Sequence, residues 1–173
     1  MSFRTSKWLL VLAAALHWSL VVFNNLIDHS TNLQYVQHVL SMDTVDEANR
    51  GNWRAISSPT VQHAVYWLII LTETAAATML WIGGLRLGQA VKGTEVAFAA
   101  AKDRAVQGLT LVLLLFFSGF TSVGGEWFMM WQSATWNGVN SAGRLFAIHA
   151  LILLWLTQPD PNFANGSGPS REP

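Results

Sequence analysis

Four long apolar segments, separated by shorter polar ones, dominate the pattern along the chain. An α-helix needs about 20 apolar residues to cross ~30 Å of hydrocarbon. Three of the segments are long enough to span with tilt, and the fourth is at the short end of the range. The pattern predicts an all-α fold, a bundle of four transmembrane helices. We expect these helices at about residues 8–27, 61–85, 105–130 and 142–157, together forming one membrane domain, residues 1–157.

The polar segments between the helices differ in length. Between the first two helices, residues 28–60 contain Leu33, Val36, Val39 and Leu40 at helical spacing, which predicts a short amphipathic helix on the membrane surface. Residues 158–173 are rich in Pro, Gly and polar residues. We expect them to form a disordered cytoplasmic tail.

The distribution of lysine and arginine predicts the orientation, because short cytoplasmic loops carry the excess of positive charge. Seven basic residues fall on the side of the two termini: Arg4, Lys7, Arg86, Lys92, Lys102, Arg104 and Arg171. Three fall on the other side: Arg50, Arg54 and Arg144. Both termini are therefore predicted to be cytoplasmic, and the segment 28–60 becomes an outer loop.

Composition supports a membrane protein and excludes several functions. Only 12% of the residues are charged, against about 25% in a typical soluble domain. The zero formal charge offers no basic face for nucleic acid. The chain has no cysteine, which excludes disulfides, thiolate nucleophiles and Cys-based metal sites. No phosphate loop, zinc-binding His pair or Ser/His/Asp motif is present, so we assign no catalytic residues and no metal site, and an enzyme is disfavoured.

Polar residues within the apolar segments mark a candidate site, because polar groups in hydrocarbon are costly unless they face the bundle interior. Helical phase and depth place several of them near the outer ends of the helices. If the helices pack as an ordinary bundle, these residues converge on one outer polar vestibule. Its expected members are Asn24, Asn25, Asp28, His63, Glu126 and Arg144.

The stretch "GGEWFMMWQSATWNG", Gly124 to Gly138, supplies both a carboxylate and three indoles to this region. Tryptophan is enriched at membrane–water interfaces, so interfacial anchoring alone accounts for Trp127, Trp131 and Trp136. The alternative is that these indoles form an aromatic wall around the vestibule or a face for a partner protein. Glu126 and Arg144 are candidates for an ion pair between two helix ends.

Three ionisable side chains are predicted to lie deeper in the membrane. Glu73 follows His63 by ten residues, about 15 Å along a helix, which places it near the middle of the bilayer. His17 and His149 lie on the first and fourth predicted helices. These two histidines are geometrically able to ligate a haem b between the helices.

Several motifs resemble one family of bacterial small integral membrane proteins, the domain of unknown function 2165 family. They are "FNNLID" at 23–28, "QYVQHVLSMDT" at 34–44, "WRAISSP" at 53–59, "YWLIILTE" at 66–73, and "GGEWFMMWQS" followed by "WNG". The resemblance covers about residues 7–156. It implies a four-helix protein of the bacterial inner membrane, with no reaction assigned. Where the family tends to carry an aromatic and proline segment after "MDT", this chain has "VDEANRG".

Three functions remain open from the sequence. The first is a non-catalytic subunit or accessory factor of an inner-membrane complex, which contacts lipid and a membrane-protein partner or a second copy of the chain. The second is a haem-binding or quinone-site redox subunit that uses His17 and His149. The third is a small proton-coupled carrier that uses Glu73, with His17 as its neighbour.

Overall fold

The computed structural model describes residues 2–160. The described chain is helical, without strands. Its α-helices are α1 (Phe3–Ile27), α2 (His29–Ser41), α3 (Pro59–Ala90), α4 (Glu95–Ala101), α5 (Asp103–Leu114) and α6 (Val139–Thr157). A π-helix, η2 (Leu115–Trp127), continues α5, and η1 (Glu47–Asn49) and η3 (Met130–Gln132) are single 3₁₀ turns.

Four helical spans in the described chain are long and apolar enough to cross a membrane: Phe3–Ile27, Pro59–Ala90, Glu95–Trp127 and Val139–Thr157. The predicted all-α bundle of four transmembrane helices is thus confirmed. The third span begins ten residues before the expected position, because α4 and α5 follow each other with only Lys102 between them. The fourth, at 19 residues, is the shortest.

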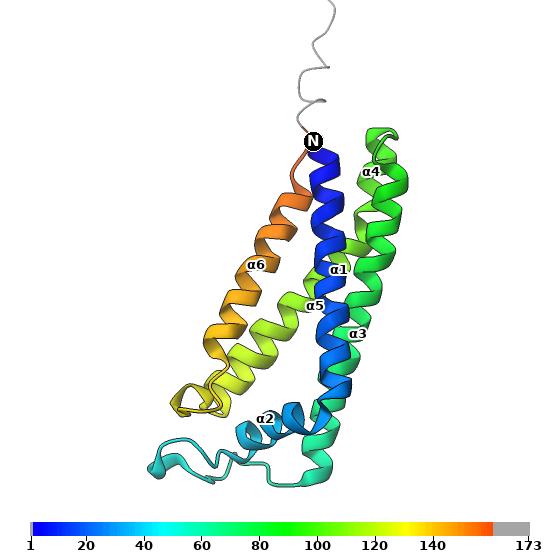
Figure 1. Ribbon diagram of the computed structural model, residues 1–173. Helices are drawn as coiled ribbons and strands as arrows, with labels where there is room; N and C mark the ends of the chain where they lie inside the picture. Colours follow the sequence, from blue (N-terminus) through cyan, green and yellow to red (C-terminus); the bar gives the residue numbers. More distant parts are fainter. Residues whose placement is uncertain (1, 161–173) are drawn as a thin grey trace, which may run out of the picture.

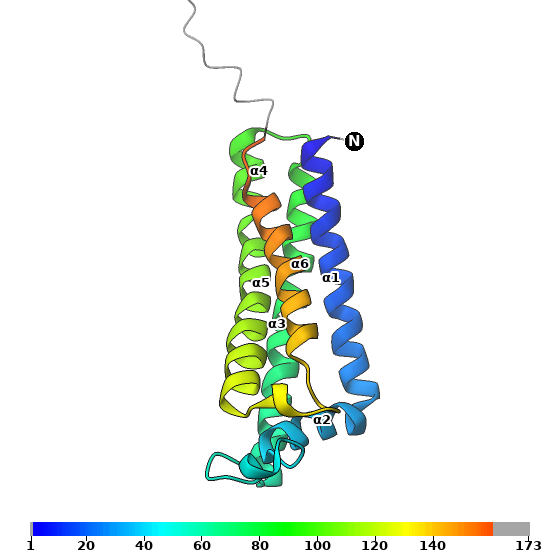
Figure 2. The same ribbon diagram turned by 90° about the vertical axis from the view of Figure 1, so that its left-hand side faces the viewer.

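The spans run side by side, and the two ends of the bundle differ (Figures 1 and 2). At the terminal end lie the start of α1, the end of α6 and α4. At the opposite end, which we call the loop end, α2 lies across the bundle beside the two long connections, residues 42–58 and 128–138 (Figure 1). The short amphipathic helix expected between the first two spans is therefore present as α2, with Leu33, Val36 and Leu40 buried.

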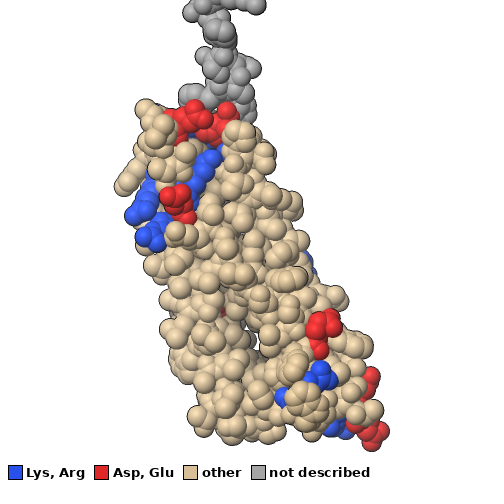
Figure 3. Space-filling model, turned by 180° about the vertical axis from the view of Figure 1, so that it is seen from behind, with Lys and Arg blue, Asp and Glu red and all other residues tan. Residues whose placement is uncertain are grey.

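Charged side chains gather at the two ends of the bundle and leave an uncharged zone between them on the face shown in Figure 3. Hydrocarbon favours such a zone, since a charge at mid-membrane is costly. Exposed leucines lie along the spans, among them Leu16, Leu20, Leu68 and Leu151. In water these side chains would be unfavourable, whereas in a bilayer they contact lipid.

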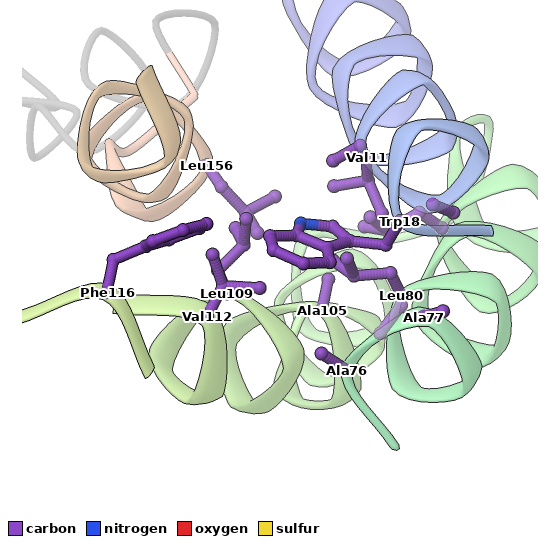
Figure 4. Close-up of a cluster of buried hydrophobic side chains, with 14 of the residues drawn as sticks. Val11, Trp18, Ala76, Ala77, Leu80, Ala105, Leu109, Val112, Phe116 and Leu156 are labelled. Carbon is purple, nitrogen blue, oxygen red and sulfur yellow. The ribbon is translucent and has the colours of Figure 1, made fainter. Parts of the chain in front are cut away.

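The core of the bundle surrounds one indole (Figure 4). Trp18 of α1 is 0% exposed and projects between the other spans. It packs near Leu80 of α3, Phe116 of η2 and Leu156 of α6, all in one cluster of buried residues. Its ring centroid lies 5.6 Å from that of Phe116. This tryptophan is a core residue, unlike the interfacial tryptophans expected from the sequence.

Small residues allow α3 to approach α5 closely. A Cβ atom on Gly83 would lie 2.5 Å from the backbone nitrogen of Ala105, and one on Gly108 would lie 3.1 Å from the carbonyl oxygen of Ala76. Close backbone contacts of this kind drive helix association in lipid, where apolar surface gains nothing by leaving the solvent.

We therefore expect Gly83→Ala to destabilise the bundle by about 1–3 kcal/mol, because the added methyl group forces the two backbones apart. Gly143→Ala is the matched control, since a Cβ at Gly143 meets nothing within 4 Å. The measurement is equilibrium unfolding of both variants in mixed micelles. Equal stability of the two variants would show that the α3–α5 contact is looser than described.

An ionic cluster closes the terminal end. The Lys7 ammonium group, 0% exposed, donates to the Asp160 carboxylate at 2.9 Å and also to the Gln158 carbonyl. Arg4 donates to the other carboxylate oxygen at 2.7 Å and to the carbonyl of Gly93. The cluster joins the start of α1 to the segment after α6 and to the α3–α4 turn.

The predicted disordered tail, residues 158–173, is only partly covered by the structure. Its first residues hold fixed contacts, with Asp160 buried against Lys7. Residues 161–173, including Arg171, lie outside the described part of the chain. No sequence pattern predicts the Lys7–Asp160 contact, because Asp160 lies in a segment with the composition of a linker.

Candidate functional site

The loop end is closed by a folded cap, which we define as α2 with residues 42–58 and 128–138. Hydrogen bonds join its two connections: the Thr44 and Ser133 hydroxyls lie 2.9 Å apart, and the Gln132 side-chain oxygen accepts from the Asp46 backbone and the Asn49 amide. Met42 is fully buried in a left-handed conformation, with φ 52°, where it ends α2. The long connections are therefore held in one arrangement.

Aromatic contacts add to these hydrogen bonds. The His38 ring stacks on Trp136 at 4.7 Å between centroids, and its Nδ1 donates to the Asp43 carboxylate at 2.8 Å. The Tyr35 hydroxyl donates to the Met130 sulfur at 2.7 Å. Burial raises the pKa of the Tyr35 hydroxyl to about 12, against a smaller lowering by a backbone hydrogen bond with Gly138. Tyr35 therefore stays neutral across the physiological range.

The predicted aromatic wall divides into two parts. Trp136 is half-buried within the cap, where it packs on His38. Trp127 and Trp131 are exposed, at 48% and 53%. Trp127 contacts Trp53, which is 83% exposed and meets it edge to face at 5.7 Å, while the Arg54 guanidinium lies over the Trp127 ring. Trp53 and Arg54 were absent from the wall expected from the sequence.

The residues of the predicted vestibule do not form one cluster. Among the described residues, neither Glu126 nor Arg144 forms an ion pair, and both are exposed. Asn24 and Asp28 are also exposed near the end of α1. His63 stacks on His29, with 6.1 Å between ring centroids, on the side of α3. Only Asn25 turns into the bundle, because α2 occupies the end of the bundle where the others were expected to meet.

Asn25 instead meets Glu73. The Asn25 amide donates to Oε2 of the Glu73 carboxylate at 2.7 Å, and the Tyr66 hydroxyl donates to the backbone carbonyl of Asn25, also at 2.7 Å. Glu73 is 4% exposed. Since Asn25 lies two residues before the end of α1, the Glu73 carboxylate lies beside the last turns of α1. This pairing is possible because α3 begins beyond the end of α1 (Figure 1).

Glu73 lines a cavity of about 200 Å³ between α1, α2, α3, η2 and α6, which we call the inner chamber. Polar side chains of Asn25, Asn32, Tyr35 and Tyr66 share its wall with Trp18 and Phe116. In the described structure, no hydrogen bond reaches the second oxygen of Glu73, Oε1. This oxygen is not completely enclosed by other atoms. Oε1 therefore retains accessible surface, on a residue that lines the chamber.

An apolar groove of about 330 Å³ lies beside the inner chamber. Towards the loop end, η2 diverges from α3, and α2 spans the gap between them (Figure 1). The groove occupies this gap, with Leu68, Leu115 and Val123 among its lining residues. The face shown in Figure 3 is hollowed between its middle and the loop end. Tyr35, Val36, Ile69 and Phe120 line both spaces and form the partition between them.

The π-helix forms one wall of the groove. Over 13 residues it replaces the i to i−4 pattern by i to i−5, as in the bond from the Phe128 amide to the Val123 carbonyl at 3.0 Å. Such helices are rare and mostly a single turn long, and they occur frequently at functional sites. Gly119 and Gly124 face the groove and leave room that larger side chains would fill.

His17 and His149 lie together, as helical position predicted, with ring centroids 5.8 Å apart. Their surroundings do not fit haem ligation. His149 Nε2 accepts a hydrogen bond from the Trp18 indole at 3.0 Å, and its Nδ1 donates to the Leu145 carbonyl at 2.7 Å. Both ring nitrogens are thus engaged in the core. We interpret His149 as a packing residue that orients Trp18.

The hypothesis of a proton-coupled carrier expected His17 beside Glu73. His17 contacts Trp18 and His149 instead, and the hydrogen-bond partner of Glu73 is Asn25. The described residues also contain no group of three or more His, Asp or Glu side chains that could hold a metal ion.

Residues 3–159 match the family described as "Predicted small integral membrane protein (DUF2165)". The chain belongs to this family. No curated protein and no solved structure matches it. The family description agrees with the four apolar spans and names no activity.

The motifs that carry the family resemblance meet in space. "QYVQHVLSMDT" forms most of α2 and the first turn after it, and its His38 and Thr44 contact Trp136 and Ser133 of the last motif region. "WRAISSP" supplies Trp53 and Arg54 beside Trp127. "FNNLID" and "YWLIILTE" supply the Asn25–Glu73 pair. The motifs therefore build two adjacent features, the cap and the polar wall of the inner chamber.

Proposed function

We propose that the protein is a non-catalytic accessory factor of a membrane complex, which binds a partner protein through the exposed surface of its cap. The observation that carries this proposal is the cluster that Trp53 and Arg54 of the cap form with Trp127 at the end of η2. Trp131 is a further exposed tryptophan of the cap. Tryptophan and arginine are the residue types most enriched at the energetic centres of protein interfaces.

Interfacial anchoring explains this cluster less well than it explains a single indole. An anchoring tryptophan needs only to reach the headgroup region from the end of a spanning helix. Trp53 instead belongs to a connection between helices, and its ring is fixed against Trp127. The hydrogen bonds of the cap hold this surface in one shape before any partner arrives, and such preorganisation lowers the entropic cost of binding.

Two exposed charges border the cap without ion-pair partners in the described structure, Glu126 at the end of η2 and Arg144 near the start of α6. Charges at an interface rim favour the correct partner through electrostatic complementarity. A partner that carries one basic and one acidic group at the matching positions would satisfy both. These residues thus serve the proposed complex as separate rim contacts.

The excess of lysine and arginine at the terminal end supports an orientation with that end in the cytoplasm. The cap would then face the opposite side of a bacterial inner membrane. The proposed partner is a multi-pass membrane protein that presents its loops on that side. Photocrosslinking from the cap would identify this partner.

Replacement of Trp131 by a photoreactive amino acid tests the proposal in intact membranes. We expect one discrete protein adduct from this position, and an additional Trp53→Ala substitution should lower its yield about tenfold, as loss of an interface anchor does. The matched control is the same replacement at Trp155, a 38% exposed tryptophan at the terminal end, which should label lipid only. Lipid adducts alone from both positions would contradict the proposal and favour membrane anchoring.

A further inference from the structure

We propose that the groove and the inner chamber form one binding site for a long-chain amine that enters from the bilayer. Its apolar chain would lie in the groove, and its ammonium group would meet the Glu73 carboxylate. The juxtaposition of a buried carboxylate with an apolar groove opening on the membrane face carries this inference, which is independent of the proposed partner.

The groove matches the apolar chain in character, size and access. Its lining is apolar apart from Thr72 and the Tyr35 hydroxyl, and that hydroxyl is already bonded to Met130. Its volume of about 330 Å³ falls within the about 300–1,000 Å³ typical of ligand sites. Exposed side chains on its rim, Leu68 and Leu114, belong to spanning helices. A molecule dissolved in the bilayer can therefore reach it without crossing water.

The head group is specified by Glu73. An ionisable group buried within the membrane is costly unless it is paired, and it is by default a candidate functional site. In the described structure, Oε2 has only the neutral Asn25 amide as a partner, no hydrogen bond reaches Oε1, and Glu73 lines the chamber. No lysine or arginine lines either cavity. A ligand ammonium supplies both the missing positive charge and the hydrogen-bond donors.

The same observation excludes a phosphate on the ligand. Phosphate groups are bound by arginine, lysine or helix N-termini, and the residues that line the two cavities include no basic side chain. A phosphate beside Glu73 would add like-charge repulsion. The ligand class is therefore a phosphate-free amphiphile with one amine and one long chain, which excludes the common phospholipids.

The partition between the two spaces consists of side chains. Tyr35, Val36, Ile69 and Phe120 face both cavities, and the Tyr35 and Phe120 rings lie 6.5 Å apart. The proposed ligand requires these side chains to rotate apart, and side-chain rotations are fast. Phe120 belongs to η2.

The experiment measures binding of dodecylamine and of dodecanol to the purified full-length protein in an uncharged maltoside detergent, by native mass spectrometry. We expect the wild type to bind dodecylamine at least about tenfold more tightly than dodecanol, because the two probes differ only in the group that meets Glu73. Glu73→Gln should remove this preference. Glu126→Gln, which changes an exposed carboxylate of the same type, should retain it.

A groove variant covers the case in which Glu73→Gln fails to fold. Gly119→Leu extends a side chain into the groove, where a Cβ meets only Leu115 at 3.6 Å, and it should lower the affinity for dodecylamine about tenfold or more. Equal binding of the two probes by the wild type would overturn the proposal. Undiminished binding by Gly119→Leu, or a stronger retention of phosphatidylethanolamine than of dodecylamine, would overturn it as well.

Discussion

Asp160→Ala should destabilise the protein by about 3–5 kcal/mol, the typical cost when one member of a buried ion pair is removed. Among the described residues, the substitution leaves the fully buried Lys7 ammonium to the Gln158 carbonyl and the face of the Phe3 ring. The measurement is equilibrium unfolding in mixed micelles at neutral pH. A matched control is Asp43→Ala, which removes the exposed hydrogen bond from His38 and should cost at most about 1 kcal/mol.

The stability that this ionic cluster contributes should decrease at low pH. Burial alone would raise the pKa of the Asp160 carboxyl, but hydrogen bonds from Lys7 and Arg4 and the nearby positive charges outweigh it, so this pKa is lowered. A carboxyl group whose pKa is lower in the folded state than in the unfolded state stabilises the protein at pH values above its unfolded-state pKa of about 3.9. This stabilisation is lost as the pH falls through the folded-state pKa. The stability difference between wild type and Asp160→Ala should therefore shrink below about pH 4.

The double variant Lys7→Met/Asp160→Ala separates ionic from other causes. Replacement of both members of a buried pair by apolar groups is often nearly neutral. Recovery of most of the lost stability in the double variant would confirm that the unpaired Lys7 charge causes the effect. A double variant as unstable as Asp160→Ala would instead contradict the ionic account of the terminal end.

Trp18→Ala should lower stability by about 2–4 kcal/mol. Trp→Ala changes in the cores of water-soluble proteins cost roughly 3–5 kcal/mol. The expected loss is smaller here because, when the helices separate in a bilayer, the indole is transferred to lipid and not to water. The substitution leaves a void between the spans and removes the indole that donates to His149. The control is Trp81→Ala, which removes an indole that is 39% exposed and donates to Ser19 on the bundle surface.

Trp18→Phe distinguishes packing from hydrogen bonding at this position. It retains an aromatic ring but leaves His149 Nε2 without its donor, and an unsatisfied buried acceptor costs about 1–3 kcal/mol. Unfolding measurements should therefore rank Trp18→Phe between wild type and Trp18→Ala. Equal stability of Trp81→Ala and Trp18→Ala would show that Trp18 does not occupy the centre of the bundle.

Segment length and hydropathy were enough to predict the four spans and α2, because each crossing must satisfy its own backbone hydrogen bonds and present apolar side chains to lipid. Segment length and hydropathy could not predict where a span begins when its first turns are polar. Glu95 and Lys102 belong to the third span even though their side chains are charged. Residues of this type extend helices beyond the hydrocarbon, where hydropathy carries no signal.

The candidate site was predicted less completely, for reasons that particular residues show. Asn25 and Glu73 were recognised as polar residues in apolar segments, but their pairing depends on how far α3 extends past α1. Glu126 and Arg144 form no ion pair in the described structure, and α2 lies across the end of the bundle where a vestibule was expected. Trp18 was missed because an indole in the middle of an apolar segment resembles any other apolar residue.

The proposed role as an accessory factor is tested most directly by the mass of the particle that contains the protein after gentle extraction into lipid nanodiscs. The proposal predicts that wild type and Trp155→Ala are found with one second protein in fixed ratio, and that a Trp53→Ala/Trp131→Ala variant is found without it. A wild-type particle that contains only the 19.1 kDa chain, or a complex that survives the double substitution, would contradict it.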